Sequence, residues 1–352
     1  MSTSHDSIRI TEDDLRAPHV EEYLAIQQHL HREMGEIEET PLVFRILYSS
    51  WFYLSMASGL GAFVGWLICE PFFDDNAENP LGFLIFPTVA GCIGVFLGAA
   101  EGIMCRNPGR ACISAAVGLG VGFAGGMVAV FGAGLIFIVT SALAAAMDNN
   151  PRPGKIPTGL GLMFLMMGRA AAWAVAALPA GLGQGLAQRD KKVALNGLLG
   201  GVLGGLAGGL FFDPISFVLT TADGQAMASR AVGFTLIGLL VGLFVGLVEG
   251  WTKTAWLMMR QGPLAGKQFI LFRDTTVLGS SPKSEIYLFK DPAIEPRHAV
   301  IYNRGGRFEI EDCQTPEGTY VSGIPIHKHV LRSGDQIVLG KTVLEFVLKA
   351  SK

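Results

Sequence analysis

The chain has 352 residues, of which 50% are apolar and 46 are glycine, and it carries a net charge of -3. Soluble domains have about 25% charged residues, whereas this chain has 16% and a mean hydropathy of +0.42, so we expect much of it to lie in lipid. The charge balance leaves no basic surface for nucleic acid, and the five cysteines have neither the pattern of a disulfide framework nor the spacing of a zinc site.

Residues 1–42 are predicted to form an acidic cytoplasmic segment ahead of the first apolar run. The segment has no apolar region or cleavage site of a signal peptide. The sequence TEDD at residues 11–14 resembles a capping box, and the apolar residues between Val20 and Ile37 predict a short amphipathic helix. Thr11 and Thr40 lie among acidic residues and are candidate kinase targets; the alternative is a solvated acidic segment.

Six apolar runs between residues 43 and 257 are each long enough to cross a bilayer, which takes about 20 residues. The predicted spans are Ile46–Cys69, Leu81–Ile103, Cys112–Phe131, Leu162–Ala187, Leu195–Phe212 and Ala231–Trp251. The stretch Gly132–Met147 is also apolar and leaves the end of the third span open. The sequence therefore predicts six membrane helices, with seven as the alternative.

The six runs are predicted to form three related helical hairpins. The second, fourth and sixth runs end alike, in GVFLGAAEG, ALPAGLGQG and GLFVGLVEG, and the other three share GAFVGW, GFAGGM and GLAGGL. Glycines four residues apart let helix backbones approach closely in lipid. We therefore expect a polytopic α-helical membrane bundle packed by a glycine zipper. The Gly-rich helices are also a candidate surface for a homo-oligomer, and a pore or a hinge is the alternative use of the glycines.

Positive residues indicate how the bundle is oriented. Lys and Arg follow the second, fourth and sixth runs, whereas residues 70–80 between the first two runs have none. Because positive loops stay in the cytoplasm, we expect a multi-pass protein of the cell (inner) membrane with both termini in the cytoplasm.

Four polar residues are predicted at membrane depth: Glu101, Arg169, Gln184 and Glu249. The two glutamates are expected at the cytoplasmic helix ends, with Arg106 and Lys253 about one turn beyond and able to pair with them. An ion or proton site is the alternative for the glutamates. Arg169 and the similarly placed Arg230 are expected at the outer ends of their helices, with an anion pathway as the alternative.

From Gly266 the pattern changes to the period-two alternation of short strands, which predicts an all-β sandwich over residues 266–352 after a linker at 258–265. The order of several motifs is specific: Leu278-Gly279, IYLFKDPAIEPRHAVI, EIED, GTYVSG and LRSGDQIVLGKTVLEFV. Together they resemble the forkhead-associated (FHA) domain family. The whole chain resembles bacterial multi-pass membrane proteins with a C-terminal cytoplasmic FHA domain.

The resemblance implies a phosphothreonine site, but this chain departs from the family where the phosphate is held. Family members use an arginine after the strand-end glycine, a serine three residues before the histidine, a Thr-Asn pair before the Gly-Thr turn, and often an asparagine before the final glycine. The corresponding residues here are Ser280, Glu295, Pro316 with Glu317, and Ser322. The residues that the resemblance marks as architectural are retained: Gly279, His298, Gly318, Thr319 and Gly323.

The candidate interaction loops contain Ser280, Ser281, Lys283, Glu295, Arg297, Glu317 and Ser322. A phosphothreonine carries a charge of about -1.5 to -2, so the two carboxylates would repel it. We therefore expect a cytoplasmic protein partner that is bound without the standard phosphothreonine contacts. Lys283 and Arg297 could compensate for the carboxylates, which leaves a different phosphate site as the alternative.

The sequence predicts no enzyme and no cofactor. Residues 334–342, GDQIVLGKT, resemble a P-loop but have five residues between the glycines where the motif needs four. We expect a membrane-embedded scaffold or adaptor that presents an FHA-like protein-interaction domain to cytoplasmic signalling or assembly partners. The alternative is a transporter, channel or translocation component that its FHA-like domain regulates.

Overall fold

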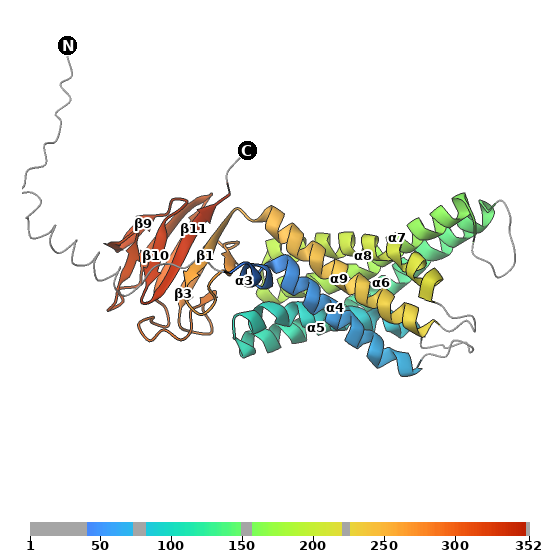
Figure 1. Cartoon of the computed structure of the whole chain (residues 1–352), viewed down its shortest axis with the longest axis horizontal. Helices are drawn as coiled ribbons and strands as arrows, with labels where there is room; N and C mark the ends of the chain where they lie inside the picture. Colours follow the sequence, from blue (N-terminus) through green and yellow to red (C-terminus); the bar gives the residue numbers. More distant parts are fainter. Residues whose placement is uncertain (1–40, 73–81, 149–156, 220–225, 350–352) are drawn as a thin grey trace, which may run out of the picture. The chain divides into compact units, whose positions relative to one another are not determined.

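The computed structural model describes residues 41–72, 82–148, 157–219 and 226–349. The described chain falls into two compact units, a helical unit at 42–254 and a β unit that begins at Ala255 (Figure 1). The predicted amphipathic helix within residues 1–40 lies outside the described residues.

Seven α-helices make up the helical unit in the described ranges. They are α3 (Leu42–Leu47), α4 (Ser50–Cys69), α5 (Ile85–Met104), α6 (Pro108–Ala146), α7 (Leu160–Gln188), α8 (Lys191–Leu219) and α9 (Met227–Thr252). Short 3₁₀ turns follow α4, as η1 (Glu70–Phe72), and precede α5, as η2 (Gly82–Leu84). The six helices α4 to α9 are long and apolar enough to cross a membrane.

The six long helices pack as a closed ring: each contacts the next in chain order, and α9 contacts α4. Glycines make the closest approaches. A Cβ at Gly94 would overlap the carbonyl oxygen of Gly118 between α5 and α6, and a Cβ at Gly181 would overlap that of Gly197 between α7 and α8. Gly242 lies in the same way against Leu54, between α9 and α4. At these points only glycine lets the two backbones meet.

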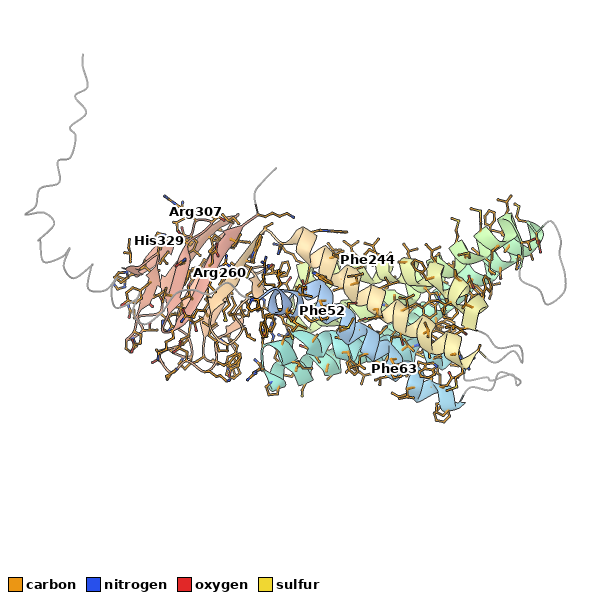
Figure 2. All side chains as sticks on the ribbon, viewed as in Figure 1. Phe52, Phe63, Phe244, Arg260, Arg307 and His329 are labelled. Atoms are coloured by element: carbon orange, nitrogen blue, oxygen red, sulfur yellow. The ribbon has the colours of Figure 1, made fainter. Side chains whose placement is uncertain are left out.

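Aromatic side chains from four helices fill part of the space inside this ring. The ring centroid of Trp173 on α7 lies 5.2 Å from that of Phe86 on α5, 5.5 Å from that of Phe234 on α9 and 6.0 Å from that of Phe212 on α8. Phe63 on α4, in contrast, points away from the neighbouring helices and is 39% exposed (Figure 2). The bundle therefore has large apolar side chains both in its core and on its outer surface.

Helix α6 corrects the predicted end of the third span. The sequence pattern placed that end near Phe131, but the helix runs without a break to Ala146 and has 39 residues. At 1.5 Å per residue its length is about 58 Å. The reason is local, because no proline follows Pro108 within the helix to interrupt the hydrogen-bonding pattern. Residues 132–146 thus continue α6 and are not a separate span.

The β unit is a sandwich of two sheets. One sheet has six strands in the order β2-β1-β11-β10-β7-β8, and the other has five in the order β4-β3-β5-β6-β9. The strands are β1 (Ala255–Gln261), β2 (Gln268–Ile270), β3 (Thr275–Gly279), β4 (Ile286–Tyr287), β5 (Ala299–Arg304), β6 (Arg307–Asp312), β7 (Thr319–Val321), β8 (Ile324–Ile326), β9 (Lys328–Val330), β10 (Gln336–Leu339) and β11 (Thr342–Leu348). Leu278, Ile310, Ile337 and Phe346 are fully buried between the sheets. Arg307 on β6 and His329 on the edge strand β9 project from the surface of the sandwich (Figure 2).

Strand β1 corrects two predicted boundaries. The sequence pattern assigned residues up to 257 to the membrane domain and 258–265 to a linker, but Ala255–Gln261 form a strand that pairs with both β11 and β2. Ala255, Leu257 and Met259 alternate inward and are buried. Because these apolar residues follow the apolar residues of α9 so closely, the two elements merged in the sequence pattern. The sandwich begins at Ala255, and only Lys253 and Thr254 separate it in sequence from the end of α9.

Candidate functional site

His298 joins two of the loops that the sequence predicted as interaction loops. Its side chain is fully buried, and its Nδ1 accepts a hydrogen bond of 3.2 Å from the backbone amide of Glu295. Its Nε2 lies 3.1 Å from the carbonyl oxygen of Gly318 and 3.2 Å from the hydroxyl of Thr315. Since a carbonyl oxygen only accepts, the proton of the ring is on Nε2. The ring therefore fixes the loop before β5 to the loop before β7.

Asp312, at the end of β6, organises the second of these loops. Its carboxylate accepts hydrogen bonds from the hydroxyls of Thr319, at 2.6 Å, and Thr315, at 3.1 Å, and from the amide of Thr315, at 3.2 Å. Burial acts to raise the pKa of Asp312, but these hydrogen bonds outweigh burial and lower that pKa below its usual value. The charged carboxylate thus holds the loop in place, and the hydroxyl of Thr319 is one of its hydrogen-bond donors.

The loop after β3 is attached to the same place. The amide of Ser280 donates to the carbonyl oxygen of Glu295 at 2.9 Å, and the hydroxyl of Ser284 donates to that of Pro296 at 3.1 Å. A Cβ on Gly279 would overlap the carbonyl oxygen of Pro296. Glycine is required at 279 because the two backbones touch there. Three loops are therefore fixed to one another along one end of the sandwich.

Most of the predicted interaction residues are exposed on these loops. The exposed ones are Lys283, Glu295, Arg297, Glu317 and Ser322, whereas Ser280 and Ser281 are half-buried. The connections through His298 bring the segments of Glu295, Arg297 and Glu317 together. Within residues 226–349, the side chains of Lys283 and Ser322 make no hydrogen bond to these segments.

Ser322 occupies a strained turn beside the site. Its φ of 49° lies in the left-handed region, where asparagine and glycine are more usual. Its amide donates to the carbonyl oxygen of Gln336 at 2.7 Å. The position is therefore a tight turn between β7 and β8.

Sequence reasoning missed Asp312, Cys313 and Thr315 as parts of the site. Arg297 forms a hydrogen bond with the thiol of Cys313, whose pKa burial raises while the neighbouring arginine acts to lower it. Arg297 is thus directed toward the loop after β6. The EIED motif that ends at Asp312 contributed to the FHA resemblance in the sequence, but none of its residues was predicted as part of the site.

The polar residues predicted at membrane depth form two separate groups. Glu101 accepts a hydrogen bond of 2.9 Å from the side chain of Gln188, a residue that the sequence did not single out. Gln184 and Glu249 are buried, and the carboxylates of Glu101 and Glu249 are electrostatic neighbours of the Tyr53 hydroxyl. Four helices, α4, α5, α7 and α9, therefore place polar groups near one end of the bundle.

The second group lies at the other ends of the helices and consists of two ion pairs. Arg169 on α7 pairs with Asp213 on α8, with 3.0 Å between Nε and Oδ1. Arg230 on α9 pairs with Glu70 after α4, with 3.1 Å between Nε and Oε2. The second pair depends on the closure of the ring between α9 and α4.

Comparison with known proteins identifies the β unit. The sequence profile of the FHA domain matches residues 276–340. The chain is 41% identical over 91 residues to the oxoglutarate dehydrogenase inhibitor of Corynebacterium diphtheriae, a match that covers 26% of this chain and 63% of that protein. It is 39% identical over 102 residues to the inhibitor of the same name from Corynebacterium jeikeium, covering 29% of this chain and 68% of that protein.

Among solved structures, the FHA domain of the CT664 protein from Chlamydia trachomatis is 28% identical, with a TM-score of 0.26 and coverage of 28% of this chain and 100% of that domain. The chain thus spans about two thirds of the length of the two curated relatives, and the matches cover less than a third of the chain itself. Through its C-terminal β-sandwich, the chain belongs to the family of proteins that carry an FHA domain.

Proposed function

We propose that this protein is a membrane-embedded scaffold or adaptor whose FHA domain binds a cytoplasmic protein partner without the standard phosphothreonine contacts. An FHA domain is a protein-interaction domain, which supplies the general role. One observation carries the specific proposal. His298 joins the loop before β5 to the loop before β7, and we call these two joined loops the binding edge. The binding edge presents the exposed carboxylates of Glu295 and Glu317.

Charge is the main argument against standard phosphate recognition. Phosphate groups are held by arginine forks and by hydroxyl or amide donors, and a hydrogen bond with a charged partner contributes about 1.5–3 kcal/mol. Ser280 offers a short hydroxyl where the family has an arginine, and it is half-buried. Glu295 and Glu317 are exposed and would repel the anion. A neutral or basic surface of a partner protein fits these loops better.

Membrane embedding is supported by the six long apolar helices and by their packing. The corresponding glycines of the three motifs, Gly98, Gly181 and Gly246, make matching close contacts with the backbone of the next helix in the ring, at Ser114, Gly197 and Trp51. This agreement supports three related hairpins. With positive residues after α5, α7 and α9, we propose the cell membrane as the location and the cytoplasm as the side of both termini.

The packing favours a scaffold over a transporter or channel. Phe86, Trp173 and Phe234 contact one another between α5, α7 and α9. A water-filled path would have to displace these rings. We also propose no catalytic activity and no cofactor. Because the corynebacterial relatives are named as inhibitors of an enzyme, an enzyme is one class of partner to test.

Recovery of the partner from detergent-solubilised membranes tests the proposal, with the tagged full-length chain as bait. We expect a specific partner whose recovery survives phosphatase treatment and is lost in Glu317→Arg, which alters the binding edge. Asp274→Arg is the matched control, because Asp274 is an exposed acid at the opposite end of β3 from Gly279. Loss of the partner on phosphatase treatment would contradict phosphate-independent binding. Equal loss in Glu317→Arg and Asp274→Arg would show that the loops are not the binding surface.

A further inference from the structure

Arg169 is held in a setting built by three helices. On one side its Nε lies 3.0 Å from Oδ1 of Asp213 on α8. Its guanidinium carbon lies 5.1 Å from the ring centroid of Phe137 on α6 and 5.4 Å from that of Phe212 on α8. Such cation–π contacts orient the guanidinium and cover it with apolar surface. The guanidinium nevertheless stays accessible, because the side chain of Arg169 is 25% exposed.

The ion pair of Arg230 and Glu70 provides an internal comparison. Arg230 uses two nitrogens on the two oxygens of Glu70, and the indole of Trp66 donates a further hydrogen bond of 2.7 Å to Oε2. Both oxygens of that carboxylate are satisfied, and the side chain of Arg230 is 13% exposed. This pair is closed and needs no ligand.

The pair of Arg169 and Asp213 differs in both respects: one carboxylate oxygen has no hydrogen bond, and the arginine is more exposed. Asp213 is only 3% exposed, and its buried Oδ2 atom has no hydrogen-bond partner among the described residues. A guanidinium has five N–H donors, and among the described residues the only carboxylate paired with Arg169 is that of Asp213. Its side chain is 25% exposed. Donors remain on Arg169, and an acceptor remains on Asp213.

The position along the helices indicates what meets these groups. At 1.5 Å per residue, about 22 Å of α7 separates Arg169 from Gln184, and about 28 Å of α9 separates Arg230 from Glu249. The hydrocarbon core of a bilayer is about 30 Å thick. With Gln184 and Glu249 near the cytoplasmic border of this core, Arg230 lies near the outer border and Arg169 lies about 8 Å inside it. From there the long side chain of Arg169 can extend toward the headgroups. This step rests on the membrane location proposed above.

We propose that Arg169, Asp213, Phe137 and Phe212 form a binding site for the phosphodiester of a phospholipid headgroup in the outer leaflet. The free N–H groups of Arg169 match the geometry of phosphate oxygens. The phosphate would bind the exposed part of the guanidinium, because Oδ2 of Asp213 is buried and out of reach of a headgroup. Leu135 and Ile138, on either side of Phe137 in α6, are each 65% exposed and offer apolar surface to acyl chains.

Thermal unfolding of the full-length protein in a neutral sugar detergent tests the site. Three additions are compared: dioleoyl phosphatidylglycerol, a dioleoylglycerol glucoside without phosphate, and inorganic phosphate. We expect only phosphatidylglycerol to raise the unfolding midpoint of the wild type. The double variant Arg169→Gln/Asp213→Asn removes both charges together, so that neither is left buried alone, and it should bind the lipid about tenfold more weakly or worse.

Two further variants keep the test decisive. Glu70→Gln/Arg230→Gln changes the closed pair and should keep the full response to phosphatidylglycerol. Arg169→Lys keeps the charge but loses the fork, so it should show an intermediate response even if the double variant does not fold. An unchanged response in both Arg169 variants would overturn the proposal, as would an equal rise with the phosphate-free lipid. An equal rise with inorganic phosphate alone would overturn the assignment to a lipid.

Carbonate extraction of membranes separates this inference from the proposed function. Release of the wild-type protein into the soluble fraction would contradict membrane embedding itself. Retention in the membrane together with a lipid response that does not depend on Arg169 would contradict only the headgroup site.

Discussion

Strand β1 makes a sharp prediction about where the FHA domain begins. A fragment of residues 255–352 should fold alone, whereas a fragment of residues 262–352, which lacks β1, should not. In the sheet, β1 lies between β2 and β11 and pairs with both. Its removal therefore separates β2 from the sheet and exposes one side of β11.

The expected loss can be worked out from the burial of β1. Leu257 is 0% exposed and Met259 is 1% exposed. Burial of such a side chain contributes about 1.5–3 kcal/mol, so these two residues together account for about 3–6 kcal/mol. Domains have a free energy of unfolding of about 5–15 kcal/mol. Deletion of β1 thus removes much of the stability before its backbone hydrogen bonds are considered.

Urea unfolding followed by circular dichroism measures the effect. We expect a cooperative transition for 255–352 and none for 262–352. Within the longer fragment, Leu257→Ala should lower the free energy of unfolding by about 2–5 kcal/mol, and Met258→Ala, on the half-buried face of β1, should lower it less. A cooperative transition of the shorter fragment at the same urea concentration would refute the reasoning.

Three other predictions concern charge, packing and orientation. Because the pKa of Asp312 is lowered in the folded domain, its contribution to stability is present above the pKa of the unfolded chain and is lost as pH falls through the folded pKa; urea midpoints of 255–352 should therefore fall in acid, and less so in Asp312→Asn. Gly204→Leu should destabilise the purified bundle, because a Cβ there would overlap the backbone of Val241, whereas Gly120→Leu has open space and should be tolerated; equal unfolding midpoints would contradict the glycine packing. Epitope tags after residues 79 and 221, which lie outside the described residues, should be reached from outside the cell, and tags after Arg189 and at the C-terminus should not; an accessible C-terminus would reverse the orientation.

Much of the fold could be predicted because it depends on local patterns. Apolar runs long enough to cross a bilayer predicted the six long helices, and the order of the strand and turn motifs predicted the FHA sandwich, which the family match confirms. The ends of α6 and the start of β1 could not be located, because an apolar sequence shows no boundary where a helix continues or where a strand follows.

The site was predictable only in part, because its contacts join distant segments. The motif around His298 indicated an architectural histidine, but the sequence did not show that it would join Glu295 to Gly318. Likewise, Arg230 was noticed in the sequence, but its pairing with Glu70, 160 residues away, was not. Their pairing requires α9 to close the ring against α4, which no local pattern encodes.

The central claim is that the FHA domain keeps its binding loops without the phosphothreonine contacts. Calorimetric titration of residues 255–352 with peptides from a phosphothreonine library and their unphosphorylated counterparts tests this claim most directly. The account predicts that phosphate gives no gain in affinity for the wild type, and that Ser280→Arg/Glu295→Ser/Glu317→Asn creates phosphate-dependent binding on the same loops. Tight wild-type binding that phosphatase treatment abolishes would contradict the account and assign the phosphate to other donors, such as Lys283.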